Sequence, residues 1–214
     1  MVRRLRSAFG QQSLSWIAVG AIWFGASYGG LVMLTMYANS PGPSHQAPRR
    51  WPVTSSIRLS DRGATLILFA HPRCPCTRAS LGELEKIAAR FPDSVTLWVV
   101  FFKPTEFEDS WDQTDLRRTA EAIPAVRVAS DMDGDEAHRF NATTSGQVLL
   151  YNDQGELLYS GGITLARGHA GDNAGRSAIE SYLMGNLPIS RQSPVFGCPI
   201  AVAPQQTQAT TDVN

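Results

Sequence analysis

The chain has 214 residues with 19 basic and 19 acidic side chains, so its formal net charge is zero. That length allows one ordinary domain with additional segments. A nucleic-acid-binding protein would carry a basic stripe, and this balanced charge gives no reason to expect a nucleic-acid partner. Three cysteines are too few for a disulfide-stabilised scaffold, and their odd number leaves one to be explained.

The N-terminal segment is predicted to cross a membrane. No Asp, Glu, Lys or Arg occurs between Arg6 and Arg49, and residues 14–38 are mostly apolar. Such a segment can span a hydrocarbon core of about 30 Å as a helix. Three arginines precede it, so the positive-inside rule places residues 1–13 in the cytoplasm. A cleaved signal peptide is the alternative, but its apolar core usually has only about 7–15 residues.

An uncleaved anchor in the inner (cytoplasmic) membrane would place the rest of the chain in the periplasm or on the extracellular side, where the environment is oxidising. Gly25 and Gly29 have the spacing of small residues at which membrane helices pair. They predict either a homodimer through this face or only glycines that a membrane helix tolerates. Residues 39–55 follow, polar and rich in proline, and are predicted to be a linker.

A domain is predicted over residues 56–187. The apolar run Ala64–Ala70 indicates a strand buried on both faces, and the apolar spacing over Thr77–Phe91 indicates a helix. Beyond residue 188 an irregular tail carries Cys198, and its last ten residues, 205–214, are expected to be disordered. The remaining predicted elements are strand 95–102, helix 114–122, strand 125–129, helix 134–140, a hairpin of strands 147–151 and 156–159, and helix 173–184.

Two cysteines one residue apart, Cys74 and Cys76, lie where the first strand gives way to the helix. A helix N-terminus carries partial positive charge and free N–H donors. These stabilise a thiolate and lower its pKa. Two flanking arginines, Arg73 and Arg78, should act in the same direction. The pattern predicts a redox-active or metal-binding cysteine pair, in preference to two inert buried thiols.

The order of elements resembles the thioredoxin fold, an α/β fold with a central mixed sheet flanked by helices. Phe69-x-x-x-x-Cys74 resembles the approach to the active site in TlpA-like thioredoxins, and Cys76-Thr-Arg-Ala-Ser-Leu resembles the helix that follows. Residues 128–161 are similar to the second half of that family. The resemblance covers about residues 60–187. It extends to RedB-like extracytoplasmic proteins, which have a membrane anchor and a shortened cysteine motif.

The chain departs from that family at three places. Its cysteines have the spacing Cys-x-Cys instead of Cys-x-x-Cys. Leu68 stands where thioredoxins carry a buried acid. The loop that contains Thr144, Ser145 and Gly146 stands where the family has a cis-proline before the hairpin. By this resemblance, these three loop residues are the expected substrate-docking loop.

The resemblance implies a membrane-anchored, outward-facing thiol–disulfide oxidoreductase that uses no cofactor. Cys74 would be the nucleophile and Cys76 the resolving thiol, and the partners would be extracytoplasmic protein thiols and disulfides. A disulfide between residues two apart closes a small, strained ring, so this pair should be oxidising.

Four further residues are candidate auxiliary groups: His71, Arg73, His169 and Cys198. The first and last strands should run parallel, so the loop that contains His169 should return to the cysteines. Either histidine can serve as a proton relay or metal ligand, or His169 is simply exposed. The extended chain before Cys198 can reach about 40 Å. This cysteine is therefore a third redox thiol, a third metal ligand or a lone packed thiol.

The alternative function is a metal-binding module in extracytoplasmic metal or cytochrome assembly. Cys74, Cys76, Cys198 and His71 would hold copper, since Cu(I) favours soft thiolate ligands.

Overall fold

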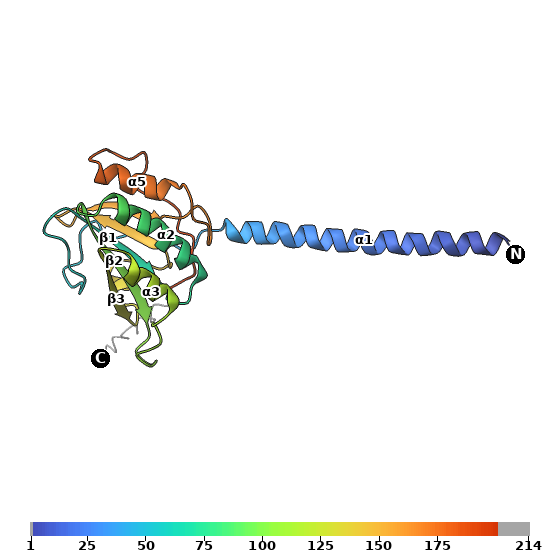
Figure 1. Ribbon diagram of the computed structural model, residues 1–214, viewed down its shortest axis with the longest axis horizontal. Helices are drawn as coiled ribbons and strands as arrows, with labels where there is room; N and C mark the ends of the chain where they lie inside the picture. The colour runs from blue at the N-terminus through green and yellow to red at the C-terminus, as the bar shows by residue number, and fades with distance from the viewer. Residues whose placement is uncertain (1, 201–214) are drawn as a thin grey trace, which may run out of the picture. The chain divides into compact units, whose positions relative to one another are not determined.

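The computed structural model describes the backbone of residues 2–200 and the side chains of residues 16–200. The chain forms two compact units, Met1–Ser40 and Pro41–Asn214. Figure 1 shows a single long helix in the first unit and an α/β body in the second. The disorder predicted for residues 205–214 lies outside the described residues.

The first unit is one helix, α1 (Val2–Ala38). Its part from Trp16 to Ala38 has 23 residues, and an 18-residue window within it has a mean hydropathy of 1.7 and is not buried. By length and composition this helix can cross a membrane, as predicted for residues 14–38. Nothing lies within 4 Å of a Cβ built on Gly25 or Gly29. Pairing of two copies through these glycines stays a prediction.

The second unit is built on a five-stranded mixed sheet. In chain order its elements are β1 (Ala64–Ala70), α2 (Pro75–Arg90), β2 (Val95–Lys103), α3 (Asp115–Ala122), β3 (Val126–Met132), α4 (Asp135–Arg139), β4 (Gln147–Tyr151), β5 (Leu157–Gly162) and α5 (Ala174–Leu183). The strand order is β3-β2-β1-β4-β5. The first three strands are mutually parallel, whereas β4 is antiparallel to both neighbours. This topology confirms the predicted thioredoxin-like α/β fold.

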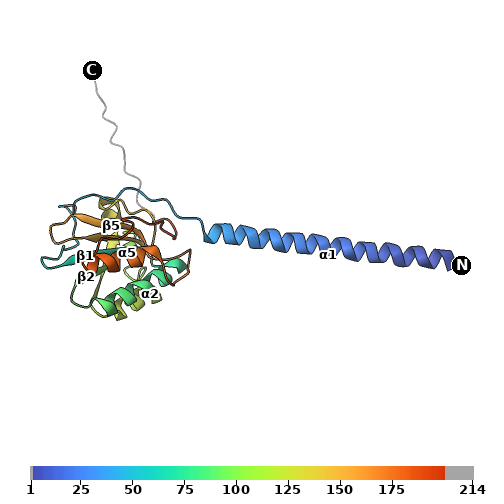
Figure 2. The same cartoon turned by 90° about the horizontal axis from the view of Figure 1, so that it is seen from above.

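Both faces of the sheet are covered, which explains why β1 is apolar along its whole length. On one face Leu66 and Leu68 join a core that includes side chains of α2, α3 and α5. On the other, Ile67 and Phe69 join a core that includes α4 and the segment before β1. A strand buried on both sides needs apolar residues at every position. Figure 2 shows α2 and α5 side by side over the first face.

Strand β3 is longer than predicted, since it continues past residue 129 to Met132. In its polar end, Ser130 and Asp131 pair with the end of β2. The buried carboxylate of Asp131 accepts the backbone N–H groups of Glu136 and Ala137, in the first turn of α4. A polar residue is therefore tolerated in this strand because it caps the next helix.

Residues 41–55, most of the predicted linker, belong to the second compact unit. Trp51 meets the rings of Phe140 and Tyr151 edge-on, with centroid distances of 5.1 and 5.3 Å. The Tyr151 hydroxyl donates to the Pro48 carbonyl at 2.9 Å. Proline removes backbone donors, so such a segment can lie on a domain with few hydrogen bonds to satisfy.

Trp51→Ala should lower the free energy of unfolding of the second unit by about 2–4 kcal/mol, because it leaves a cavity between two rings. Val53, in the same segment, is 98% exposed, and Val53→Ala should stay within about 0.5 kcal/mol of the parent chain. Urea denaturation of the full chain in detergent, followed by circular dichroism, measures both. Equal effects of the two changes would show that the segment is not packed.

Candidate thiol exchange site

Cys74 occupies the N-cap position of α2, directly after the turn that follows β1. Its backbone N–H closes this turn by donating to the His71 carbonyl at 3.1 Å. Pro75 takes the first helical position, which suits proline because its φ is already helical and no N–H partner is needed there. The predicted strand-to-helix junction is present, and the helix begins at Pro75, two residues before the predicted Thr77.

The Cys74 sulfur accepts hydrogen bonds from two parts of the chain. Cys76 and Thr77, in the first turn of α2, donate their backbone N–H groups, and Cys198 donates both its thiol and its backbone N–H. Burial raises the pKa of the Cys74 thiol, since the residue is only 2% exposed. The donors outweigh burial, the Cys198 thiol most of all, and leave the pKa of Cys74 below its ordinary value.

The other two thiols hold their protons more firmly. Burial raises the pKa of Cys76, and the negative charge of Cys74 and the hydrogen bond to it raise the pKa further. Burial and the hydrogen bond to Cys74 raise the pKa of Cys198 to about 12. Of the three thiols, Cys74 is therefore the one that loses its proton most readily, and the other two donate hydrogen bonds to it.

The predicted docking loop lies against the cysteine motif. Ser145 Oγ accepts the backbone N–H of His71 at 2.9 Å and lies 3.0 Å from the hydroxyl oxygen of Thr77. The backbone N–H of Gly146 donates to the Phe69 carbonyl at 2.8 Å. One edge of the loop is thereby tied to the end of β1 and the start of α2.

The other edge of this loop pairs with residues 192–200, called the tail strand below. Thr144 forms an antiparallel bridge with Pro199, and the Ser145 N–H donates to the Cys198 carbonyl at 2.8 Å. This pairing brings the Cys198 thiol to the other two. Of the three interpretations of Cys198, a lone thiol packed away from the pair is not observed.

The loop after β5 also reaches the thiols, as the sequence predicted. β1 and β5 run in the same direction because each is antiparallel to β4. The residues that meet Cys76 are Arg167, through its charge, and Gly168, through its backbone N–H, and both act to lower the pKa of Cys76. Sequence analysis missed these two residues. Arg167 is the only Lys or Arg between positions 161 and 171, which is the signal that could have found it.

His169 is brought into the same loop but not to a thiol. Its side chain is exposed, and its Nδ1 lies 2.7 Å from the Arg167 carbonyl oxygen. The exposed loop histidine is therefore the interpretation that the geometry favours.

His71, Arg73 and Arg78 flank the cysteines, but their side chains are engaged elsewhere. The His71 ring accepts the Arg73 N–H at Nδ1, over 3.1 Å. Burial, and then the charge of Arg73, lower the pKa of His71. The Arg73 guanidinium lies 4.7 Å from the centre of the Trp111 ring, and Arg78 pairs with a carboxylate of α3. Within residues 16–200, we find no hydrogen bond from these three side chains to a thiol.

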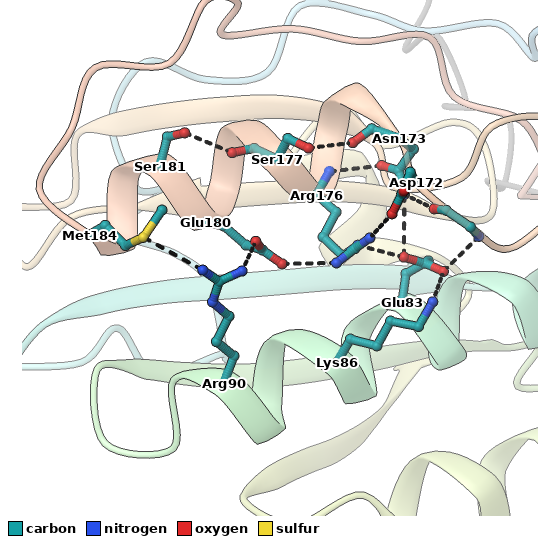
Figure 3. A network of polar contacts seen from close by, with 11 residues as sticks. Glu83, Lys86, Arg90, Asp172, Asn173, Arg176, Ser177, Glu180, Ser181 and Met184 are labelled. Carbon is teal, nitrogen blue, oxygen red and sulfur yellow. Dashed lines mark hydrogen bonds and ion pairs between the residues drawn. The ribbon is translucent and has the colours of Figure 1, made fainter.

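A buried carboxylate holds the end of the loop that carries Arg167. The side chain of Glu83, on α2, is fully buried. It accepts the Gly171 N–H at 2.9 Å and pairs with Arg176 of α5 at 2.7 Å. Figure 3 shows Arg176 reaching from α5 between Glu83 and Glu180. Since a buried ion pair is stable only when its geometry is satisfied, this network fixes the loop against α2.

The copper alternative is not supported by this geometry. Among residues 2–200 we find no group of three or more His, Cys, Asp or Glu side chains placed to hold a metal ion. The His71 Nδ1, a potential fourth ligand, already accepts a backbone N–H.

Comparison with known proteins gives similarities in structure only. No protein-family model matches the chain, and no curated protein sequence matches it. A hypothetical protein from Sinorhizobium meliloti 1021 is similar with a TM-score of 0.58 and 20% identity, over 77% of this chain and 98% of that one. An uncharacterized conserved protein from Geobacillus kaustophilus has a TM-score of 0.57 and 19% identity, over 78% and 93%.

A secreted disulfide oxidoreductase of Mycobacterium tuberculosis, homologous to E. coli DsbE, has a TM-score of 0.43 and 16% identity, over 59% of this chain and 84% of that one. The first two similarities establish a shared fold.

Cys198→Ala removes the thiol that donates to Cys74 and retains the backbone N–H. We expect the pKa of Cys74 to rise, because the largest contribution that opposes burial is lost. The rate of Cys74 alkylation by iodoacetamide, followed by mass spectrometry between pH 5 and 9, should then reach its midpoint at a higher pH. Ser181→Ala, on α5, is the control. A midpoint that stays in place would show that the Cys198 thiol does not stabilise the thiolate.

Proposed function

We propose that this protein is a thiol–disulfide oxidoreductase of thioredoxin-like fold, with Cys74 as its nucleophile. The observation that supports this is the Cys74 sulfur at the N-cap of α2, whose pKa is lowered although the residue is buried. Thiolate is the reactive form in thiol–disulfide exchange. A structural cysteine in apolar surroundings would instead have a raised pKa.

The exchange uses two cysteines and balances without a cofactor. The Cys74 thiolate attacks one sulfur of a partner's disulfide, which forms a mixed disulfide and releases the partner's other sulfur to take up a proton. Cys76 then loses its proton and attacks the Cys74 sulfur, releasing the second partner sulfur. The two cysteines lose two electrons and the partner's disulfide gains them. The same steps in reverse oxidise a partner dithiol.

The first step of this reaction prepares the second. In the free site, the charge of Cys74 and the hydrogen bond to it raise the pKa of Cys76. Both effects end when the Cys74 sulfur is bonded to a partner sulfur, whereas the charge of Arg167 and the Gly168 N–H remain. The pKa of Cys76 therefore falls at the step in which this thiol must attack.

The proposed substrates are extracytoplasmic protein thiols and disulfides. We infer that α1 anchors the chain in the cytoplasmic membrane, with the N-terminus inside and the catalytic unit in the periplasm or on the extracellular side. The apolar helix and the arginines that precede it support this orientation. Exchange chemistry suits such a compartment because protein thiols are oxidised there.

Cys74→Ser should reduce the exchange of a model protein disulfide to the uncatalysed rate. The double change Cys76→Ser with Cys198→Ser should accumulate a mixed disulfide with the partner, because no second thiol is left near Cys74 to resolve it. Reduction of insulin by glutathione, with non-reducing electrophoresis of the trapped adduct, measures both. Ser94→Ala, in the turn before β2, should match the parent chain. Full exchange by Cys74→Ser would refute the proposed function.

The orientation predicts that the thiols face away from the cytoplasm. In intact spheroplasts, a membrane-impermeant maleimide should label Cys76 or Cys198 of the full chain after mild reduction. A chain carrying Cys76→Ser and Cys198→Ser, with only the buried Cys74 left, should be labelled at least several-fold less. Labelling that appears only after lysis would place the domain in the cytoplasm.

A further inference from the structure

We propose that the tail strand is a built-in lid that covers Cys74 and closes a Cys74–Cys198 disulfide when the protein is oxidised. The inference rests on the proposed function, because it takes Cys74 to be the reactive thiol. It assigns a second state to the same site, in which the chain's own C-terminal segment is the partner of the nucleophile.

The tail strand packs against β5 and against the docking loop that contains Thr144 and Ser145. These two elements are called its seat below. The Ser193 hydroxyl lies 2.5 Å from the Tyr159 hydroxyl and donates to the Gly162 carbonyl at 2.7 Å. Val195 and Ile200 bury their side chains, at 2% and 5% exposure. Polar and apolar contacts thus fix the segment on both sides of Cys198.

Three glycines allow the tail strand to approach this closely. A Cβ on Gly161 would lie 2.6 Å from backbone atoms of Ser193, and one on Gly162 would lie 2.6 Å from the carbonyl oxygen of Pro194. A Cβ on Gly197 would lie only 1.8 Å from the Ser145 carbonyl oxygen. A larger residue at these positions would separate the strand from its seat.

The seat presents Cys198 directly to Cys74. The Cys198 thiol and backbone N–H both donate to the Cys74 sulfur, and the Cys198 carbonyl accepts the Ser145 N–H. Arg167 donates to the carbonyl of Gly197, so the loop after β5 also holds the tail strand. With Cys74 only 2% exposed, a partner disulfide reaches it only after the tail strand lifts.

The geometry favours Cys198 over Cys76 as the thiol that bonds to Cys74. Cys74 is the N-cap and Cys76 the second residue of α2, and a disulfide between residues two apart closes a small, strained ring. Cys198 comes from a separate segment, so its bond to Cys74 closes no such ring. The tail strand also keeps Cys198 at a high effective concentration.

The closing reaction balances with a disulfide as the oxidant, here oxidised glutathione. The Cys74 thiolate attacks one glutathione sulfur and releases the other as a thiolate. When the tail strand returns to its seat, the Cys198 thiol gives its proton to that thiolate and its sulfur attacks Cys74. The second glutathione leaves as a thiolate and is protonated from solvent. Cys74 and Cys198 lose two electrons, and one glutathione disulfide becomes two thiols.

The experiment maps the disulfide in the full chain, purified in detergent. The chain is oxidised with a glutathione series, alkylated, digested and analysed by mass spectrometry. We expect a peptide pair joined through Cys74 and Cys198, with Cys76 alkylated. Cys76→Ser should keep that pair, and Cys198→Ser should lose it while the thermal unfolding midpoint is retained.

Gly197→Ala tests the lid itself, because its Cβ displaces the tail strand from Ser145. It should lose the Cys74–Cys198 pair and alkylate Cys74 at least several-fold faster than the parent chain. Gly82→Ala, on α2 with nothing within 4 Å of the added Cβ, is the matched control and should behave as the parent. If Gly197→Ala does not fold, Ser193→Ala, which removes only the seat's hydrogen bonds, should shift both readouts in the same direction.

The outcomes separate the two proposals. A parent chain that exchanges with glutathione but joins Cys74 to Cys76, with Cys198 alkylated, overturns the lid and leaves the oxidoreductase in place. A chain in which Cys74 forms no disulfide at any glutathione ratio overturns both.

Discussion

The proposed site depends on stabilising a thiolate at Cys74, which is only 2% exposed. Moving an ion out of water costs several kcal/mol unless hydrogen bonds replace its hydration. The Cys74 sulfur receives such bonds from the first turn of α2 and from the tail strand. The strand-to-helix junction and the seated C-terminal segment therefore both oppose the effect of burial on the pKa of Cys74.

Helix α2 links this requirement to the rest of the domain. Its first turn donates to Cys74, and two turns later Glu83 holds Gly171, the end of the loop that carries Arg167 to Cys76. A helix segment this short behaves as one rigid body. The position of the Arg167 guanidinium relative to the thiols is thus set by the buried ion pair between Glu83 and Arg176. That explains a charge network inside an otherwise apolar interface.

How far the sequence predicts this site depends on the range of each interaction. The junction at Cys74 follows from local pattern, an apolar strand, a proline and an amphipathic helix. The return of the loop after β5 follows from topology, since strand directions fix which edge a loop reaches. The partners of Arg73 and Arg167 could not be predicted, because their choice depends on rings and thiols brought together only by the fold.

The contacts of residues 41–55 and of the tail strand could not be predicted from the sequence for a related reason. Neither segment has the periodicity of a helix or a strand, and both are held by backbone hydrogen bonds and by single side chains such as Trp51 and Val195. Gly197 looks like an ordinary loop glycine in the sequence. Its role is steric, because the Ser145 carbonyl occupies the place of a side chain, and no one-dimensional pattern records such a contact.

A lid on the nucleophile has a consequence for rate that can be bounded. Lifting the tail strand exposes Val195 and Ile200, each worth about 1.5–3 kcal/mol when buried. A net opening free energy of about 1.5–3 kcal/mol would leave the site open for roughly one part in ten to one in two hundred. Exchange would then be slowed by that factor for a partner that makes no contact with the docking loop. A partner that pairs with the backbone freed at Thr144 and Ser145 would recover part of the lost rate. The lid therefore makes the site selective through competition for one sheet edge, and it does so without a specificity pocket.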